Sequence, residues 1–350
     1  MIGRRAGRPA PFLLDDAAMW GSVVDRRTFI GIWAGGLLTM PLAAEAQSRG
    51  KTWRVGFLSG SARPPDDAVP LSLRQALQEL GYVEQQNVVY LGRWAEAKQD
   101  RLPGLAAELV GLKVDVIVTT GGPASGAAKR ATSSIPIVLA QVGDADGLGL
   151  IESLARPGGN VTGVTDQSVE LSAKRLEILT EVVPKATRIA VLWNADDLGM
   201  TMRYREVEKA AHARHVTVQP LGVREPDDFN MAFSAMTAQR PDALFLVTDA
   251  LTALNRKRVI DFALVHRIPA MYEFSFLVRD GGLMSYGANQ DDNYRKVASY
   301  VDRIFKGAAP SSLPVERPGR YYLTINLKTA KALGLALPES LLLRADQVIE

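Results

Sequence analysis

Cysteine is absent from the 350-residue chain, and histidine is nearly so. The lack of cysteine excludes disulfides, thiolate catalysis, cysteine-bound metals and a lipid anchor attached to a cysteine at a cleavage point. The only histidines are His212, His215 and His266, and no carboxylate motif of a metal site accompanies them. We therefore expect no metal ion in this protein.

An excess of charge of one sign is also missing. The chain has 41 lysines and arginines against 38 aspartates and glutamates, a net charge of +3, and no block of basic residues stands out. Proteins that bind nucleic acid usually carry a basic patch that contacts phosphates. We therefore expect no nucleic-acid partner.

The common motifs of catalytic and cofactor sites are missing as well. The sequence has no G-x-S-x-G, no G-x-x-x-x-G-K-[ST] and no G-x-G-x-x-G after its first strand. Residues 143–147 (GDADG) hint at a calcium loop, but the glycine stands fourth from Asp144, whereas a calcium loop has it sixth. We therefore expect no cofactor, no catalytic residue and no enzyme activity.

No stretch is long and apolar enough to span a membrane. The most apolar one near the start, residues 28–44, is interrupted by three glycines and a proline, and a spanning helix needs about 20 apolar residues. The arginine pair in 26–30 (RRTFI) resembles a twin-arginine export signal, and 44–46 (AEA) supplies a cleavage site. We expect residues 1–46 to be an export signal of a periplasmic protein, with Met19 as an alternative start after a spurious extension. The competing interpretation is a buried first helix of a cytoplasmic domain.

Short apolar strands alternate with amphipathic helices along the rest of the chain. The alternation breaks at Gly158-Gly159-Asn160 and then starts again. Strands rich in Val, Ile and Leu that alternate with helices predict a parallel sheet covered on both faces. The sequence therefore predicts an α/β fold of two doubly wound, Rossmann-like lobes. The clearest predicted strands are 53–59, 114–120, 135–141, 188–194 and 243–248.

Ligands of open α/β sheets bind beyond the carboxyl ends of the strands. Small or polar residues follow several predicted strands, although such residues also fill ordinary turns. The candidate ligand-binding residues chosen on this basis are Ser59, Ser61, Thr120, Gly121, Gly122, Asp144, Asn194, Asp249, Tyr272 and Tyr286.

Each of these candidates has a chemical role and a structural alternative. The glycine pair 121–122 precedes a predicted helix whose free N–H groups bind a carboxylate or phosphate, or are simply capped. Asp249 either pairs with an amine or caps the helix near Thr252. Tyr272 and Tyr286 either stack on a planar ligand or pack between the lobes.

Several stretches together resemble one family, the solute-binding proteins of ABC importers, in the group similar to tryptophan/tyrosine-binding proteins. They cover nearly the whole chain after the export signal, in order, and include GFLSG (56–60), ALQELGYVEQQNVV (76–89), RLPGLAAELV (101–110), RPGGNVTGV (156–164), LSAKRLEIL (171–179), GGLMSYG (281–287) and YLTINLKTAKALGLALP (322–338).

The resemblance implies a type I periplasmic-binding fold, with two lobes joined by three crossing strands. It implies an N-terminal lobe of 52–162 plus 287–318 and a C-terminal lobe of 163–285 plus 320–350. It also implies a monomer that closes around a small organic solute, such as an amino acid or another carboxylate, and delivers it to an ABC permease. The alternatives are a ligand-sensing domain of a regulatory system and an exported enzyme.

The sequence departs from the family pattern after its fourth strand. Gly143-Asp144 is kept, but Ala145-Asp146 stands where the family usually has Pro-Val. The additional carboxylate borders the predicted cleft, and it weighs against an aromatic amino acid as the solute.

Overall fold

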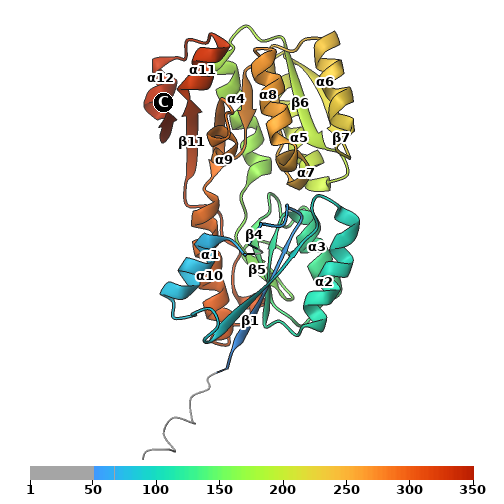
Figure 1. Ribbon diagram of the computed structural model, residues 1–350, viewed down its shortest axis with the longest axis vertical. Helices are drawn as coiled ribbons and strands as arrows, with labels where there is room; N and C mark the ends of the chain where they lie inside the picture. The colour runs from blue at the N-terminus through green and yellow to red at the C-terminus, as the bar shows by residue number, and fades with distance from the viewer. Residues whose placement is uncertain (1–50, 67) are drawn as a thin grey trace, which may run out of the picture. The chain divides into compact units, whose positions relative to one another are not determined.

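The computed structural model describes residues 51–66 and 68–350, which contain two β-sheets (Figure 1). The predicted export signal lies outside these residues. No helix in the described part of the chain has the length and apolar character needed to cross a membrane.

The first sheet has the strand order β2-β1-β3-β4-β5 within the described residues, and all of its strands are parallel. Its strands are β1 (Trp53–Ser59), β2 (Val88–Trp94), β3 (Val116–Thr120), β4 (Ile137–Gln141) and β5 (Val161–Gly163). The helices around it are α1 (Leu71–Glu79), η1 (Gln99–Arg101), α2 (Leu102–Gly111), α3 (Gly122–Ala131) and, from much later in the chain, α10 (Gln290–Phe305).

Helices cover both faces of this sheet. One core joins side chains of α1 and α10, such as Leu73 and Val297, to Val55 and Val116 of the strands, and α1 and α10 lie side by side in Figure 1. The other core joins α2 and α3 to the opposite face. Because both faces are buried, the strands are almost continuously apolar, which is why the sequence predicted them.

The second sheet has the order β12-β11-β10-β9-β8-β6-β7 within the described residues. Its strands are β6 (Arg188–Asn194), β7 (Thr217–Val223), β8 (Ala243–Leu246), β9 (Ala270–Tyr272), β10 (Met284–Ala288), β11 (Tyr321–Asn326) and β12 (Gln347–Ile349). Its helices are α4 (Ser168–Val182), α5 (Leu198–His212), α6 (Asp228–Ala238), α7 (Ala250–Leu254), α8 (Arg256–Val265), α9 (Ser275–Arg279), α11 (Leu327–Leu333) and α12 (Glu339–Arg344). The 3-10 turn η2 (Pro310–Ser312) precedes β11.

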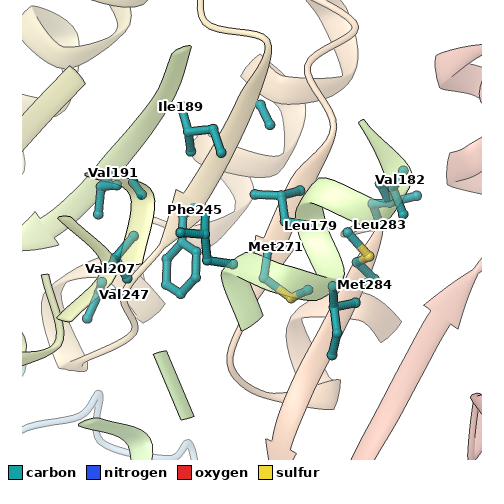
Figure 2. Close-up of a cluster of buried hydrophobic side chains, with 14 of the residues drawn as sticks. Leu179, Val182, Ile189, Val191, Val207, Phe245, Val247, Met271, Leu283 and Met284 are labelled. Atoms are coloured by element: carbon teal, nitrogen blue, oxygen red, sulfur yellow. The ribbon is translucent and has the colours of Figure 1, made fainter. Parts of the chain in front are cut away.

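Figure 2 shows part of the core of this second sheet. Leu179 of α4 lies with Phe245 of β8 and Met271 of β9, and all three side chains are fully buried. Burying each such side chain contributes roughly 1.5–3 kcal/mol. The alternation of apolar strands and helices therefore folds as predicted, into doubly wound α/β sheets, and the predicted fold class is confirmed.

One strand pair departs from the parallel arrangement. β10 pairs with β11 in antiparallel register, with Met284 opposite Ile325. The reason is connectivity, because the chain leaves β10 for α10 on the first sheet and returns into β11 from the other direction.

Two glycines stand where the chain passes between the sheets. Gly163 ends β5 with φ 131°, and a Cβ there would lie 2.3 Å from the Leu139 carbonyl oxygen. A Cβ on Gly287 of β10 would lie 2.2 Å from the Glu273 carbonyl oxygen. Backbone therefore packs directly on backbone at both positions, and only glycine allows it.

Candidate functional site

A cavity of about 350 Å³ opens at the carboxyl ends of strands from both sheets. This is the size of a small-molecule site. Ser59, Thr120 and Gln141 reach it from the ends of β1, β3 and β4. Asn194 reaches it from the end of β6, and Thr248 from the segment after β8.

The wall from the first sheet carries linked hydroxyl groups. Thr120 Oγ1 donates to Ser59 Oγ at 2.8 Å, and Ser59 Oγ and Ser61 Oγ lie 2.8 Å apart. Gly121, at φ 80°, then turns the chain into α3, and Pro123 lies in the first turn of that helix. Hydroxyls beside a helix N-terminus suit an anionic or carbonyl group of a ligand.

Aromatic side chains form much of the apolar lining. The ring of Phe57 lies 6.3 Å from that of Trp94 and 6.5 Å from that of Tyr294. Phe274, just before α9, and Phe276, within α9, also line the cavity, with their ring centroids 6.1 Å apart. This wall suits a planar or apolar part of a ligand.

Aspartates lie on the second sheet's side of the cavity. Asp249 Oδ2 accepts from Asn194 Nδ2 at 2.6 Å, and Asp249 Oδ1 accepts from Thr252 N at 2.9 Å. Asp249 therefore caps α7 and also lines the cavity. The two roles that the sequence left open for this residue, a helix cap and a contact to a ligand, do not exclude each other.

Asp197 caps α5 and also lines the cavity. Its Oδ1 accepts from Gly199 N at 2.8 Å and from Met200 N at 3.3 Å. Burial, followed by the charge of Asp249, raises the pKa of Asp197 to about 6, although Arg203 and the two backbone bonds oppose the shift.

A buried ion network lies beside these carboxylates. Glu273 accepts from Arg175 Nη1 at 2.9 Å and from Arg203 Nη1 at 2.8 Å. Arg203 Nη2 also lies 3.5 Å from Asp166 Oδ2. Arg175 Nε donates to the Tyr286 carbonyl at 2.6 Å, so the network holds β10 as well.

Burial acts on both arginines of the network. Desolvation lowers the pKa of Arg175, with Glu273 opposing the shift. For Arg203 burial also favours the neutral form, but Glu273, Asp166 and Asp197 outweigh it and leave the pKa raised.

Six of the ten residues predicted from the sequence line the cavity. They are Ser59, Ser61, Thr120, Gly121, Asn194 and Asp249. Gly122 lines a smaller adjoining cavity of about 240 Å³, together with Asp196 and Asp197. The structure thus brings strand ends from both halves of the chain to one place.

The other three predicted residues do not line the cavity. Tyr272 is 1% exposed and packs in the core of the second sheet, where burial raises its pKa. Asp144 Oδ1 accepts from Gly147 N at 2.9 Å within a turn, and burial raises the pKa of Asp144. Tyr286 packs near Tyr321, with ring centroids 6.1 Å apart. The exposed carboxylate of Asp146 does not reach the cavity either, so it gives no reason to exclude an aromatic solute.

Sequence reasoning missed the aromatic lining, Asp197 and the ion network. Trp94 is the last residue of β2, and a strand end is a signal that the strand-end rule could have used. Arg203 gave no signal, because an arginine within an amphipathic helix usually faces solvent. Only its long-range partners reveal that it is buried.

Comparison with known proteins places these features in context. The family model described as ABC transporter substrate binding protein matches residues 62–349. The chain is 26% identical over 286 residues to the tyrosine-binding protein of Clostridioides difficile (strain R20291). This alignment covers 81% of this chain and 82% of that protein.

Solved structures are similar as well. A conserved domain protein from Vibrio cholerae aligns with a TM-score of 0.80 and 27% identity over 85% of this chain and 100% of its own. A Streptococcus pneumoniae ABC domain in complex with L-Trp aligns at 0.78, with 26% identity and the same shares covered. A ligand-free, open substrate-binding protein from Clostridium difficile aligns at only 0.61, also with 26% identity, over 86% of this chain and 99% of that one. At equal identity, the chain aligns with a higher TM-score to the L-Trp complex than to the ligand-free, open structure.

Proposed function

Because the chain belongs to the family of ABC transporter substrate-binding proteins, we propose that it captures a small organic solute outside the cytoplasmic membrane and delivers it to an ABC permease. The relatives are solute-binding proteins, and the chain is a binding protein, not an enzyme. The observation that carries the proposal is the cavity of about 350 Å³, which is lined from both sheets.

Closure of two lobes around the solute is the mechanism that we propose. The N-terminal lobe comprises 52–162 plus 287–318, and the C-terminal lobe 163–285 plus 320–350. The strand order and the packing of α10 against α1 support this division. A ligand stabilises the closed state only through contacts made to both lobes at once.

Close contacts across the cleft support such closure. A Cβ on Gly60 would lie 3.3 Å from the Ala250 Cβ. A Cβ on Gly143 would lie 2.8 Å from Arg203 Nη2. The small residues at 60 and 143 therefore let the two walls approach each other.

The solute that the lining supports has an aromatic or apolar part and a polar head group. An aromatic or other amino acid meets this description. One relative is a tyrosine-binding protein, and one similar structure is a complex with L-Trp. The aromatic rings would contact the apolar part, and the hydroxyls of Ser59 and Thr120 would contact a carboxylate.

Export through residues 1–46 completes the proposal. The arginine pair and the small-residue site at 44–46 support it. The mature protein would then start near Gln47 and work in the periplasm.

A solute screen by thermal shift, with native mass spectrometry of freshly purified protein, tests the proposed function. At a hundred-fold excess over Kd, a ligand adds about 2.7 kcal/mol to the free energy of unfolding, which raises Tm by several degrees. A screen of amino acids, aromatic acids, amines, nucleobases and sugars that finds no shift, with no retained solute by mass, would overturn the proposal.

A further inference from the structure

Gly92 lies in β2, the edge strand of the first sheet, two residues before Trp94. A Cβ on Gly92 would lie 1.8 Å from Cη2 of Trp94, 2.4 Å from Cζ3 and 2.6 Å from Cζ2. These atoms belong to the six-membered ring of the indole. Non-bonded carbon atoms prefer a separation of about 3.5–4.0 Å, so a side chain at position 92 fits only if the ring moves.

The backbone conformation does not require a glycine at this position. Gly92 is not one of the glycines with a positive φ, and glycine in the interior of a strand is less favourable than a residue with a side chain. The packing of the Trp94 indole on its Cα is therefore the physical reason for a glycine here.

The register of the sheet shows in which direction the indole folds. β1 and β2 pair in parallel, with Phe57 beside Gly92 and Ser59 beside Trp94, and paired residues point to the same face. Trp94 is the last residue of its strand, but its ring reaches back to the level of Gly92, 6.3 Å from the ring of Phe57. The space beside Ser59, at the carboxyl edge of the sheet, is therefore not filled by the indole, and both Ser59 and Trp94 line the cavity there.

A side chain at position 92 leaves the indole two directions. One leads past the edge of the sheet, because β2 has a neighbouring strand on one side only within the described residues. The other leads forward to the carboxyl edge, where the cavity lies. Trp94 is 6% exposed, and a ring that swings past the edge loses burial, which costs free energy in proportion to the apolar area exposed. The forward position keeps the ring against the apolar lining formed by Phe57 and Tyr294.

We propose that Gly92 determines how large a solute the cavity accepts, because it lets the indole of Trp94 fold back and keeps the space beside Ser59 free. Gly92 is a positioning residue: it does not line the cavity itself and acts through Trp94. The inference rests on the proposed solute-binding function and adds a determinant of specificity to it. With glycine at position 92 the cavity accepts a bulky solute, and with a side chain there it accepts only small ones.

The first test compares wild type with Gly92→Ala by calorimetric titration of L-alanine, L-leucine, L-phenylalanine and L-tryptophan. The loss of affinity should grow with the size of the amino acid. It should be less than twofold for the smallest one that the wild type binds, and at least tenfold for the largest. An equal loss for all of them would overturn the proposal, because a fold that is merely destabilised weakens every solute by the same factor.

Two further variants separate the role of the indole from an effect on the sheet. Once Trp94→Leu has removed the ring, adding Gly92→Ala should change the affinity for the largest amino acid less than twofold, and a further tenfold loss would contradict a role through the ring. The control is Gly56→Ala in β1, where the new Cβ would lie 3.2 Å from Val114 in the core on the opposite face. This change should lower Tm and leave the ratio of the affinities unchanged.

A crystal structure of Gly92→Ala provides a readout that needs no solute. The indole of Trp94 should lie at the carboxyl edge, beside Ser59. An indole that has swung past the edge of β2, or that still lies over residue 92, would overturn the proposal. So would a Gly92→Ala protein that does not fold, because the ring then has no position in the cavity.

The outcomes separate this inference from the proposed function. If the four amino acids do not bind but another solute of the wider screen does, solute binding stands and the crystal structure of Gly92→Ala decides the inference. If wild type binds the amino acids and Gly92→Ala binds them equally well, the role of Gly92 is wrong, while solute binding stands. If no solute of any class binds, the proposed function fails and the inference fails with it.

Discussion

Asn194 donates from Nδ2 to Asp249 Oδ2 at 2.6 Å, across 55 residues of sequence. Asn194 ends β6 and Asp249 follows β8, and these two strands pair in parallel. Parallel strands bring their carboxyl ends to one edge of the sheet, so two turns that are distant in sequence become one wall. The wall holds Asp249 in place from both sides, since Thr252 N also donates to it.

Asp249 caps α7, and two substitutions separate the effect of this cap from the effect of its charge. Asp249→Ala removes the cap of α7 and should lower the free energy of unfolding by about 0.5–2 kcal/mol. Asp249→Asn keeps a capping oxygen and should lower it much less. Urea denaturation of both variants measures the difference. Equal destabilisation by the two variants would show that the charge, and not the cap, stabilises the fold.

Asp197 should make stability depend on pH. Its pKa in the fold is about 6, against 3.8 for an ordinary aspartate. When the pKa of an acid is higher in the folded protein than in the unfolded one, the acid stabilises the fold at pH values below its pKa in the unfolded protein. This contribution is lost as the pH rises through its pKa in the folded protein. Asp197→Asn, which keeps a capping side chain, should therefore be more stable than wild type at pH 8, by at most about 3 kcal/mol.

Melting curves between pH 4 and pH 8 check this sign. The difference in Tm between Asp197→Asn and wild type should shrink as the pH falls from 8 to 4. A difference that stays constant over this range would contradict a raised pKa.

Glu273 should be the most sensitive charged residue of the fold. Glu273→Gln leaves Arg175 and Arg203 buried without their shared counter-charge. Removing one partner of a buried ion pair typically costs about 3–5 kcal/mol. The control is Asp261→Asn, which breaks an exposed pair with Lys257 and should cost about 0.3–0.5 kcal/mol. Denaturant unfolding of both variants gives the comparison, and similar losses would contradict the assigned burial.

Gly287 should not tolerate a side chain. In Gly287→Ala the new Cβ would lie 2.2 Å from the Glu273 carbonyl oxygen, so the backbone must shift and stability should fall by about 1–3 kcal/mol. Gly104→Ala is the control, because a Cβ there meets nothing within 4 Å in helix α2. This change should stabilise by about 0.5–1 kcal/mol. Melting curves should therefore shift in opposite directions.

Export should depend on Arg26 and Arg27. Replacing both with lysine should keep the unprocessed chain in the cytoplasm, because the twin-arginine pattern is lost. Fractionation of the native host followed by N-terminal sequencing measures this, with a mature start near Gln47 expected for wild type. Unprocessed wild-type protein in the cytoplasm would overturn the export prediction.

The sequence determined the fold class because its patterns are local. The apolar runs at 53–59 and 188–194 became β1 and β6 with the predicted bounds. Alternation with helices made the strands parallel, and parallel strands bring their carboxyl ends together. Ser59 and Thr120 could therefore be placed at the edge of one sheet, and Asn194 at the edge of the other, before any contact was known.

Tertiary structure decided everything that depends on the direction of a side chain or on a distant partner. Tyr272 is the last residue of β9 and packs in the core of the sheet, while Phe274 lies beyond the end of that strand and reaches the cavity. Arg203 looked like a surface residue of α5, but Glu273, 70 residues away, made it a buried cation. Because Arg203 pairs with Glu273 and Asp166, it belongs to the buried ion network, and no local pattern of the sequence could show this.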